Sequence, residues 1–128
     1  MNAKRLYFEH ASMMEHWQGK MHLLADPQTG EPMWVGHVVV YNRALPITAV
    51  YPEEYPCCPP RVYAGVPIPP GTPHMLPNNE ICWHEHAVSG PNKWDPAHDT
   101  AAMAIGAVQH WWAACLIYVT TGKWPPNK

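Results

Sequence analysis

Residues 77–83 read Pro77-Asn78-Asn79-Glu80-Ile81-Cys82-Trp83, a short polar turn that leads into a cysteine. The two asparagines tolerate the left-handed backbone of a tight turn, and we expect Glu80 and Ile81 to be extended. Nine prolines occur from position 52 to position 77, so the segment approaching the cysteine is stiff. A thiol carried by a rigid, irregular loop is better placed for chemistry than one inside a helix. The stretch therefore indicates Cys82 as a candidate nucleophile with a solvent-reachable thiol.

The composition is typical of a small folded domain. The 128 residues suffice for a single domain, 1–128, with one hydrophobic core. Seven tryptophans, six tyrosines and sixteen prolines favour compact aromatic packing over disorder. The formal charge of -2 offers no basic surface for nucleic acid, so we expect no nucleic-acid partner. No glycine-rich phosphate-binding loop is present, and we expect no cofactor.

The cysteines and the N-terminus bear on the compartment. Cys57 and Cys58 are adjacent, which makes them a poor disulfide pair, and no secretory signal precedes the domain. These features predict a reducing compartment, the cytoplasm.

Residues 101–119 carry no formal charge and approach the length that spans a bilayer. Six of them are alanine, one is glycine, and Gln109-His110 lies in the middle. Placing that polar pair in hydrocarbon is costly, so we predict a buried helix and no membrane partner.

The order of hydrophobic patterns predicts an α+β domain. Helical spacing of apolar residues predicts a helix over 5–17, and a second helix follows Trp94-Asp95-Pro96, capped by Asp95 or Asp99 and ending at Val119 or Thr120 before Gly122. Strands are expected at 21–24, 33–41, 47–51 and 62–66. Their connections are short, so the four strands should form an antiparallel meander. A cis peptide bond fits the aromatic–proline sequence Tyr55-Pro56.

Three motifs occur in a fixed order: Tyr55-Pro56-Cys57-Cys58-Pro59-Pro60, then Ile81-Cys82, then Trp94-Asp95-Pro96. This order resembles the core of ubiquitin-conjugating enzymes, and the resemblance covers residues 47–96. It implies the UBC-like fold: an N-terminal helix, a four-stranded antiparallel meander, an active-site loop and one long C-terminal helix. Because the sequence stops at Lys128, we expect the last two helices of the full fold to be absent.

The pattern departs from the common form of that family. His-Pro-Asn usually begins ten residues before the cysteine, whereas Thr72-Pro73-His74 stands here, so His74 takes the asparagine position. The Trp111-Trp112 helix followed by Gly122-Lys123-Trp124-Pro125 resembles compact bacterial relatives. Those relatives occur in ubiquitin-like and antiphage defence (CBASS-type) operons.

The resemblance implies thioester chemistry at Cys82. Its thiolate would take the C-terminal glycine of a ubiquitin-like or other glycine-tailed protein from an activating enzyme and pass it to an amine. In the bacterial relatives the cargo can be a nucleotide cyclase. Two other functions stay open: an inactive UBC-like binding module, and a thiol hydrolase that removes such conjugates. A buried structural cysteine is the alternative to any reactive role.

His74 is the second candidate catalytic residue. It would donate a hydrogen bond to the developing oxyanion, act as a base on the incoming amine, or bond the loop backbone. Asn79 is a candidate auxiliary residue. Tyr55, Pro59, Pro60 and Trp94 are expected to form a structural platform beneath the cysteine, while Lys4 and Arg5 lie where relatives meet their activating enzyme.

His84, Glu85 and His86 follow the cysteine directly and spell Cys-x-His-x-His with it. Zinc sites usually draw their ligands from two separated pairs, and no second pair follows at a suitable spacing. We therefore expect no metal. The three residues would form a polar rim that meets the substrate amine, or an ordinary solvated loop.

Overall fold

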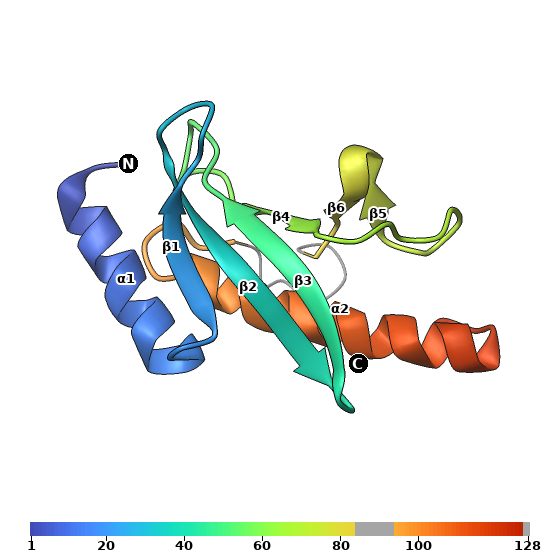
Figure 1. Cartoon of the computed structure of the whole chain (residues 1–128). Coiled ribbons are helices and arrows are strands. Elements are labelled where there is room, and N and C mark those ends of the chain that lie inside the picture. Colours follow the sequence, from blue (N-terminus) through green and yellow to red (C-terminus); the bar gives the residue numbers. More distant parts are fainter. Residues whose placement is uncertain (84–93, 127–128) are drawn as a thin grey trace.

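The structure, a computed structural model, describes residues 1–83 and 94–126. A single six-stranded antiparallel sheet shares one hydrophobic core with two helices. The second helix crosses behind the longest strands, and its C-terminal half extends beyond them toward the side where the two shortest strands lie (Figure 1).

The first helix, α1 (Ala3–Trp17), begins two residues earlier than predicted. Its N-cap is Asn2, whose side-chain oxygen accepts the backbone N–H of Arg5 at 2.8 Å. Glu9 and Met13 lie one helical turn apart and are completely buried, so this side of α1 packs into the core.

The four-stranded meander predicted from the sequence is confirmed. Its strands are β1 (Met21–Ala25), β2 (Pro32–Val40), β3 (Arg43–Val50) and β4 (Arg61–Ala64), and each pairs antiparallel with the next. In β3, Leu45, Ile47 and Ala49 alternate into the core, as expected for a sheet covered on one face. Tyr41 and Asn42 have positive φ and form the two-residue turn between β2 and β3.

The sequence predicted a sheet of four strands, but the sheet continues beyond β4. Two short strands, β5 (Met75–Leu76) and β6 (Glu80–Ile81), flank the 3-10 turn η1 (Pro77–Asn79), and β6 pairs with β4. The strand order is therefore β1-β2-β3-β4-β6-β5. β4 was predicted to reach residue 66 but ends at Ala64. The side-chain amide of Asn79 donates to the carbonyls of Ala64 and Val66, at 2.9 and 2.7 Å, in place of a neighbouring strand.

The second helix, α2 (Ala101–Thr121), begins later than predicted, and neither Asp95 nor Asp99 caps it. The N-cap is Thr100. The two aspartates instead close a turn of their own, in which the Asp99 N–H donates to the Asp95 carbonyl and the Asp95 N–H to the Asp99 carboxylate, each at 2.8 Å. Gly122 ends the helix as predicted, with φ of 77° and its N–H bonded to the Tyr118 carbonyl.

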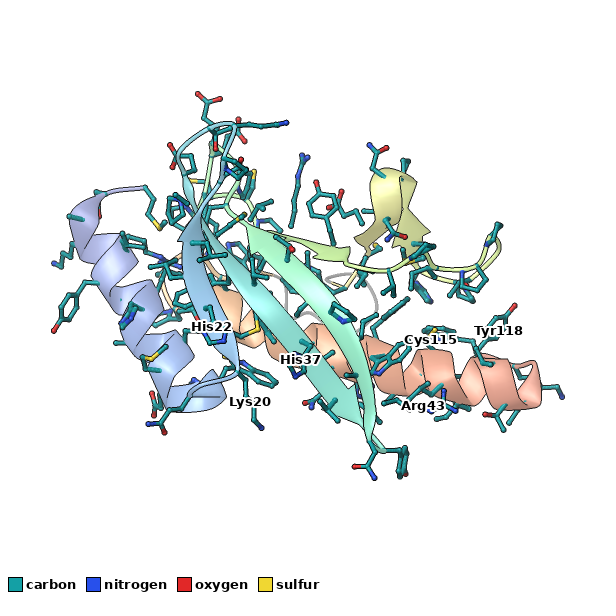
Figure 2. The ribbon with its side chains drawn as sticks, in the orientation of Figure 1. Lys20, His22, His37, Arg43, Cys115 and Tyr118 are labelled. Atoms are coloured by element: carbon teal, nitrogen blue, oxygen red, sulfur yellow. The ribbon has the colours of Figure 1, made fainter. Side chains whose placement is uncertain are left out.

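By length and composition alone α2 qualifies as a membrane span, a test that the core helix of a soluble protein also passes. Its predicted burial is confirmed along one side, where Ile105, Val108 and Trp111 are completely buried. Cys115 and Tyr118 follow on its C-terminal half (Figure 2). Within the described residues, which run to 126 at this end, no helix follows α2.

Candidate functional site

Cys82 directly follows β6 and stands opposite His74. Its backbone N–H donates to the His74 carbonyl at 2.9 Å, one position beyond the Met75–Ile81 pair of the β5–β6 ladder. We call residues 74–82 the cysteine hairpin. Its turn is the predicted one: Asn78 and Asn79 have φ of 65° and 66°, and the Glu80 N–H bonds the Pro77 carbonyl.

The Cys82 side chain is buried, with 7% of its surface exposed. The sequence predicted a solvent-reachable thiol, and this expectation is wrong for the structure. The reason lies in the next residue. Trp83 is 2% exposed, donates its Nε1–H to the Pro60 carbonyl at 3.2 Å and meets the Trp94 ring edge-on at 6.2 Å, so it draws the chain inward.

Two of the four platform residues, Pro60 and Trp94, contact Trp83, the residue after Cys82. Tyr55 is buried and packs against Trp94, with ring centroids 5.7 Å apart. The Trp94 Nε1–H donates to the Pro56 carbonyl at 2.6 Å, and the Tyr55–Pro56 peptide bond is cis, as the sequence suggested. Pro60 is buried. Pro59 is half-buried and lines an open cavity of about 360 Å³ together with Cys58, Leu76 and Glu80.

Glu9 is a buried carboxylate that sequence reasoning missed. Its Oε1 accepts the Tyr51 hydroxyl at 3.0 Å and the Ala101 N–H at 2.9 Å, while its Oε2 accepts the Tyr55 hydroxyl and the Arg5 Nε–H, the latter at 3.0 Å. Burial in this cluster raises the pKa of Tyr51 and of Tyr55 well above the usual range. The available signal was its position four residues from both Arg5 and Met13, on the inner side of α1.

Arg5 is half-buried and is held by contacts within the domain. Its side chain is 12% exposed and donates to the carbonyls of Pro96 and Asp99, at 2.6 and 2.5 Å, in addition to its ion pair with Glu9 at 2.9 Å. The contact of Arg5 with an activating enzyme stays a prediction. Lys4, by contrast, is exposed.

The remaining candidates that the structure describes, His74 and Asn79, both belong to the cysteine hairpin. His74 is exposed, with φ of 61°, and its ring centroid is 5.3 Å from that of Trp124. The side-chain amide of Asn79 donates to the carbonyls of Ala64, at the end of β4, and Val66. His84, Glu85 and His86 lie outside the described residues. Among the residues that the structure describes, no three His, Cys, Asp or Glu side chains are grouped to hold a metal ion.

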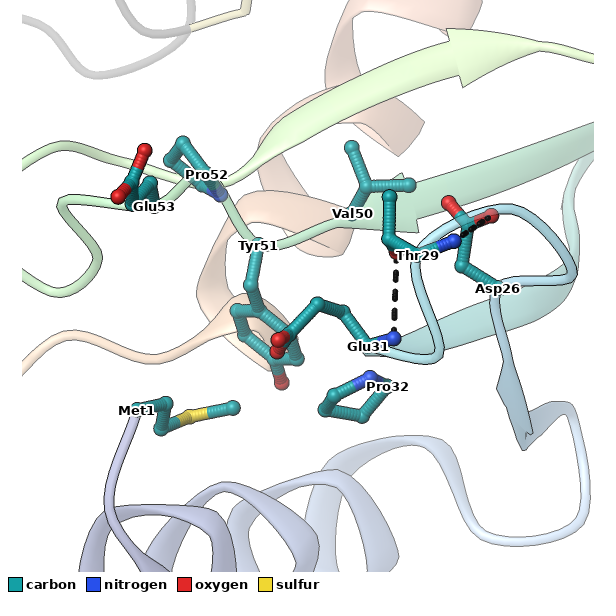
Figure 3. Close-up of a pocket in the computed structure, with 9 residues that line it drawn as sticks. All are labelled: Met1, Asp26, Thr29, Glu31, Pro32, Val50, Tyr51, Pro52 and Glu53. Carbon is teal, nitrogen blue, oxygen red and sulfur yellow. Dashed lines mark hydrogen bonds between the residues drawn. The ribbon is translucent and has the colours of Figure 1, made fainter.

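A second cavity, of about 450 Å³, opens between the N-terminus, the β1–β2 turn and the residues after β3 (Figure 3). Carboxylates of Asp26, Glu31 and Glu53 line it, together with Tyr51. The Asp26 carboxylate bonds the backbone N–H groups of residues 28 and 29, which fixes the turn. Cys82 and His74 are not among its described lining residues, so this cavity is separate from the cysteine hairpin.

Comparison with known proteins identifies the architecture. No protein-family model matches the sequence, and no curated protein matches it. Among solved structures, the chain is similar to the Vps23 UEV domain in its complex with ubiquitin, with a TM-score of 0.53 and 15% sequence identity over 83% of this chain and 79% of the other. An N-terminal helix, an antiparallel sheet and a C-terminal helix follow in the same order. The chain therefore has the α+β fold shared by ubiquitin-conjugating enzymes and UEV domains.

Proposed function

We propose that the protein is a ubiquitin-conjugating-enzyme-like transferase that carries a ubiquitin-like protein, or another glycine-tailed protein such as a nucleotide cyclase, as a thioester on Cys82. The observation that supports this most is the pairing of Cys82 with His74 across one hairpin of a UBC-like fold. A bacterial antiphage defence system is part of the proposal because the motifs resemble those of the compact bacterial relatives. The cytoplasm is part of it because the cysteines favour a reducing compartment.

The reaction has two acyl transfers. The Cys82 thiolate attacks the carrier's thioester carbonyl, a new S–C bond forms, and the activating enzyme's thiolate leaves. An amine then attacks the Cys82 thioester, an amide bond forms, the amine loses a proton and the Cys82 thiolate is released. A neutral imidazole donates one hydrogen bond, which His74 would direct to the carbonyl oxygen as negative charge develops.

The burial of Cys82 requires the hairpin to open before the carrier is accepted. The backbone of the hairpin pairs with β4 at two positions, Val62–Ile81 and Tyr63–Glu80, and the Asn79 side-chain amide adds hydrogen bonds to the Ala64 and Val66 carbonyls. Segments with few backbone bonds open at lower free energy than core strands. The proposal therefore includes a closed state, which the structure shows, and a more exposed state that reacts.

A binding module without catalysis is the second candidate. The 7% exposure of Cys82 favours it, as does the likeness to a UEV domain solved in complex with ubiquitin. In that case the chain binds a ubiquitin-like protein without a covalent bond, and Cys82 is a core residue. The cysteine itself favours the transferase, since inactive variants of the fold generally lack it.

A non-reducing gel separates these functions. The chain is incubated with a ubiquitin-like carrier, its activating enzyme and ATP. A reductant-sensitive adduct that Cys82→Ala abolishes and Cys115→Ala retains supports the transferase; Cys115 is the matched buried cysteine, in α2. Carrier binding without an adduct supports the binding module. Cleavage of a preformed conjugate without an adduct supports the hydrolase.

A further inference from the structure

The segment after α2 folds back beside the cysteine hairpin. Gly122 turns the chain in a left-handed conformation, and the half-buried Trp124 then packs against Tyr118 and Trp111, at ring-centroid distances of 5.9 and 6.3 Å. The Trp124 ring also lies 5.3 Å from the His74 ring. Figure 2 shows Tyr118 on the part of α2 that extends beyond β3. The tail thus joins α2 to the start of the hairpin.

The indole of Trp111 holds Pro73, the residue before His74. Trp111 is completely buried, and its Nε1–H donates to the Pro73 carbonyl at 3.3 Å. Pro73 and His74 are consecutive, so one tryptophan fixes the backbone and the other contacts the imidazole of the next residue. These contacts come from positions 38 to 50 residues later in the chain.

His74 needs such support. Its φ of 61° lies in the left-handed region, which non-glycine residues keep only where their surroundings hold them. Its carbonyl also accepts the Cys82 N–H. The conformation of His74 therefore links the tail on one side to the backbone of the candidate nucleophile on the other.

We propose that Trp124 is a positioning residue: its ring fixes the His74 imidazole and backbone at the base of the cysteine hairpin, and through His74 it sets the rate of transfer from Cys82. The second part rests on the proposed function. Nothing in the sequence predicted this role, since Trp124 lies outside the hydrophobic period of α2 and 50 residues from His74.

The rival explanation is that Trp124 only adds buried aromatic area. Trp112 provides the matched control, because it is also half-buried and also packs against Trp111, at 6.4 Å. Its Nε1–H, however, donates to the Arg43 carbonyl at the start of β3, at 3.0 Å. Trp112→Ala therefore removes the same kind of ring from the same aromatic cluster. The contact that it removes is with β3 of the meander and not with the cysteine hairpin.

The contact is tested first without chemistry. In the full chain labelled on histidine, the His74 ring resonance is assigned by its loss in His74→Gln. We expect Trp124→Ala to move this resonance, because the ring current of the indole is removed, while Trp112→Ala leaves it in place. An unmoved resonance in Trp124→Ala overturns the proposal. This result does not depend on whether Cys82 forms a thioester.

The reaction is tested by single-turnover discharge of the Cys82 thioester to free lysine. Trp124→Ala should slow discharge by about ten- to a hundredfold, the range that misplacement of a reacting group produces, with Trp124→Phe close to wild type. On a His74→Ala background Trp124→Ala should have no further effect. Equal slowing by Trp112→Ala, or effects that add to His74→Ala, contradicts the proposal. If the wild type forms no adduct, the proposed transferase function is wrong, but the contact between Trp124 and His74 is not affected by this result. The His74 resonance then decides whether Trp124 holds His74.

Discussion

The carboxylate of Glu9 accepts the backbone N–H of Ala101, 92 positions away in the chain, at 2.9 Å. Ala101 is the first residue of α2, so the Glu9 side chain of α1 accepts a hydrogen bond at the N-terminus of α2, where the helix dipole is positive. The same carboxylate bonds Tyr55 of the platform. Glu9 therefore connects α1, the start of α2 and the segment that carries Tyr55 through one buried carboxylate.

Glu9→Gln should destabilise the protein strongly. The substitution keeps the size of the side chain but leaves Arg5 without its anionic partner, and breaking a buried ion pair in this way costs about 3–5 kcal/mol. Urea unfolding measures the loss. Glu15, exposed on the same helix, is the control, and Glu15→Gln should change the free energy of unfolding by less than about 0.5 kcal/mol. Equal effects of the two substitutions would show that the Glu9 cluster is not a structural node.

Stability should fall at alkaline pH because of Tyr51 and Tyr55. Burial raises both pKa values, so the folded protein keeps protons that the unfolded chain loses above pH of about 10. Stability is full below that pH and declines above it, by about 1.4 kcal/mol per pH unit for each tyrosine. Urea unfolding between neutral and alkaline pH gives the slope.

Tyr51→Phe should reduce the slope of the free energy of unfolding against pH in the alkaline range, whatever its effect on stability at neutral pH. Tyr7→Phe is the control, because Tyr7 is 81% exposed, and this substitution should leave the slope unchanged. An unchanged slope in Tyr51→Phe would mean that the Tyr51 hydroxyl is not buried beside Glu9 in solution.

Asn79→Gly should cost about 2 kcal/mol, because the left-handed backbone is kept while two side-chain hydrogen bonds are lost, at about 1 kcal/mol each. Asn79→Ala should cost more, since alanine also resists the φ of 66°. Asn78, exposed and with φ of 65°, is the matched position. There the change to glycine should be neutral by thermal or urea unfolding. If Asn78→Gly and Asn79→Gly behave alike, the Asn79 amide does not fasten the hairpin to β4.

Thiol labelling should separate Cys82 from Cys115, although their exposed fractions, 7% and 4%, differ little. Burial raises the pKa of the Cys115 thiol, and a helix in the core rarely opens, so Cys115 should react slowly. Cys82 should react faster if the hairpin opens, with the exposed Cys57 faster still. Mass spectrometry after timed alkylation gives the order. Equally slow labelling of Cys82 and Cys115 counts against a reactive hairpin and favours the binding module.

The elements that the sequence predicted are those with local causes. The meander follows from alternating side chains and short connections, and the end of α2 follows from Gly122. The pairing of β5 and β6 was not predictable, because two-residue strands have no period. Thr100, Asp95 and Asp99 are all suitable caps, and only the turn between the aspartates, fixed in three dimensions, leaves Thr100 at the N-cap.

The candidate site was predicted in part for the same reason. The order of motifs indicated Cys82 as a candidate, and the two consecutive asparagines indicated the turn at residues 78–79. The depth of Cys82 depends on Trp83, whose partners Pro60 and Trp94 come from two other segments. The contact between His74 and Trp124 likewise joins distant positions, and neither has a spacing that a single sequence can reveal.

Intact mass spectrometry under non-reducing conditions shows whether Cys82 carries a thioester. The chain is mixed with a ubiquitin-like carrier, its activating enzyme and ATP. We expect a species with the mass of chain plus carrier less a molecule of water, which dithiothreitol removes and which Cys82→Ala does not form. A wild-type protein that stays at its own mass while it binds the carrier would contradict thioester transfer at Cys82.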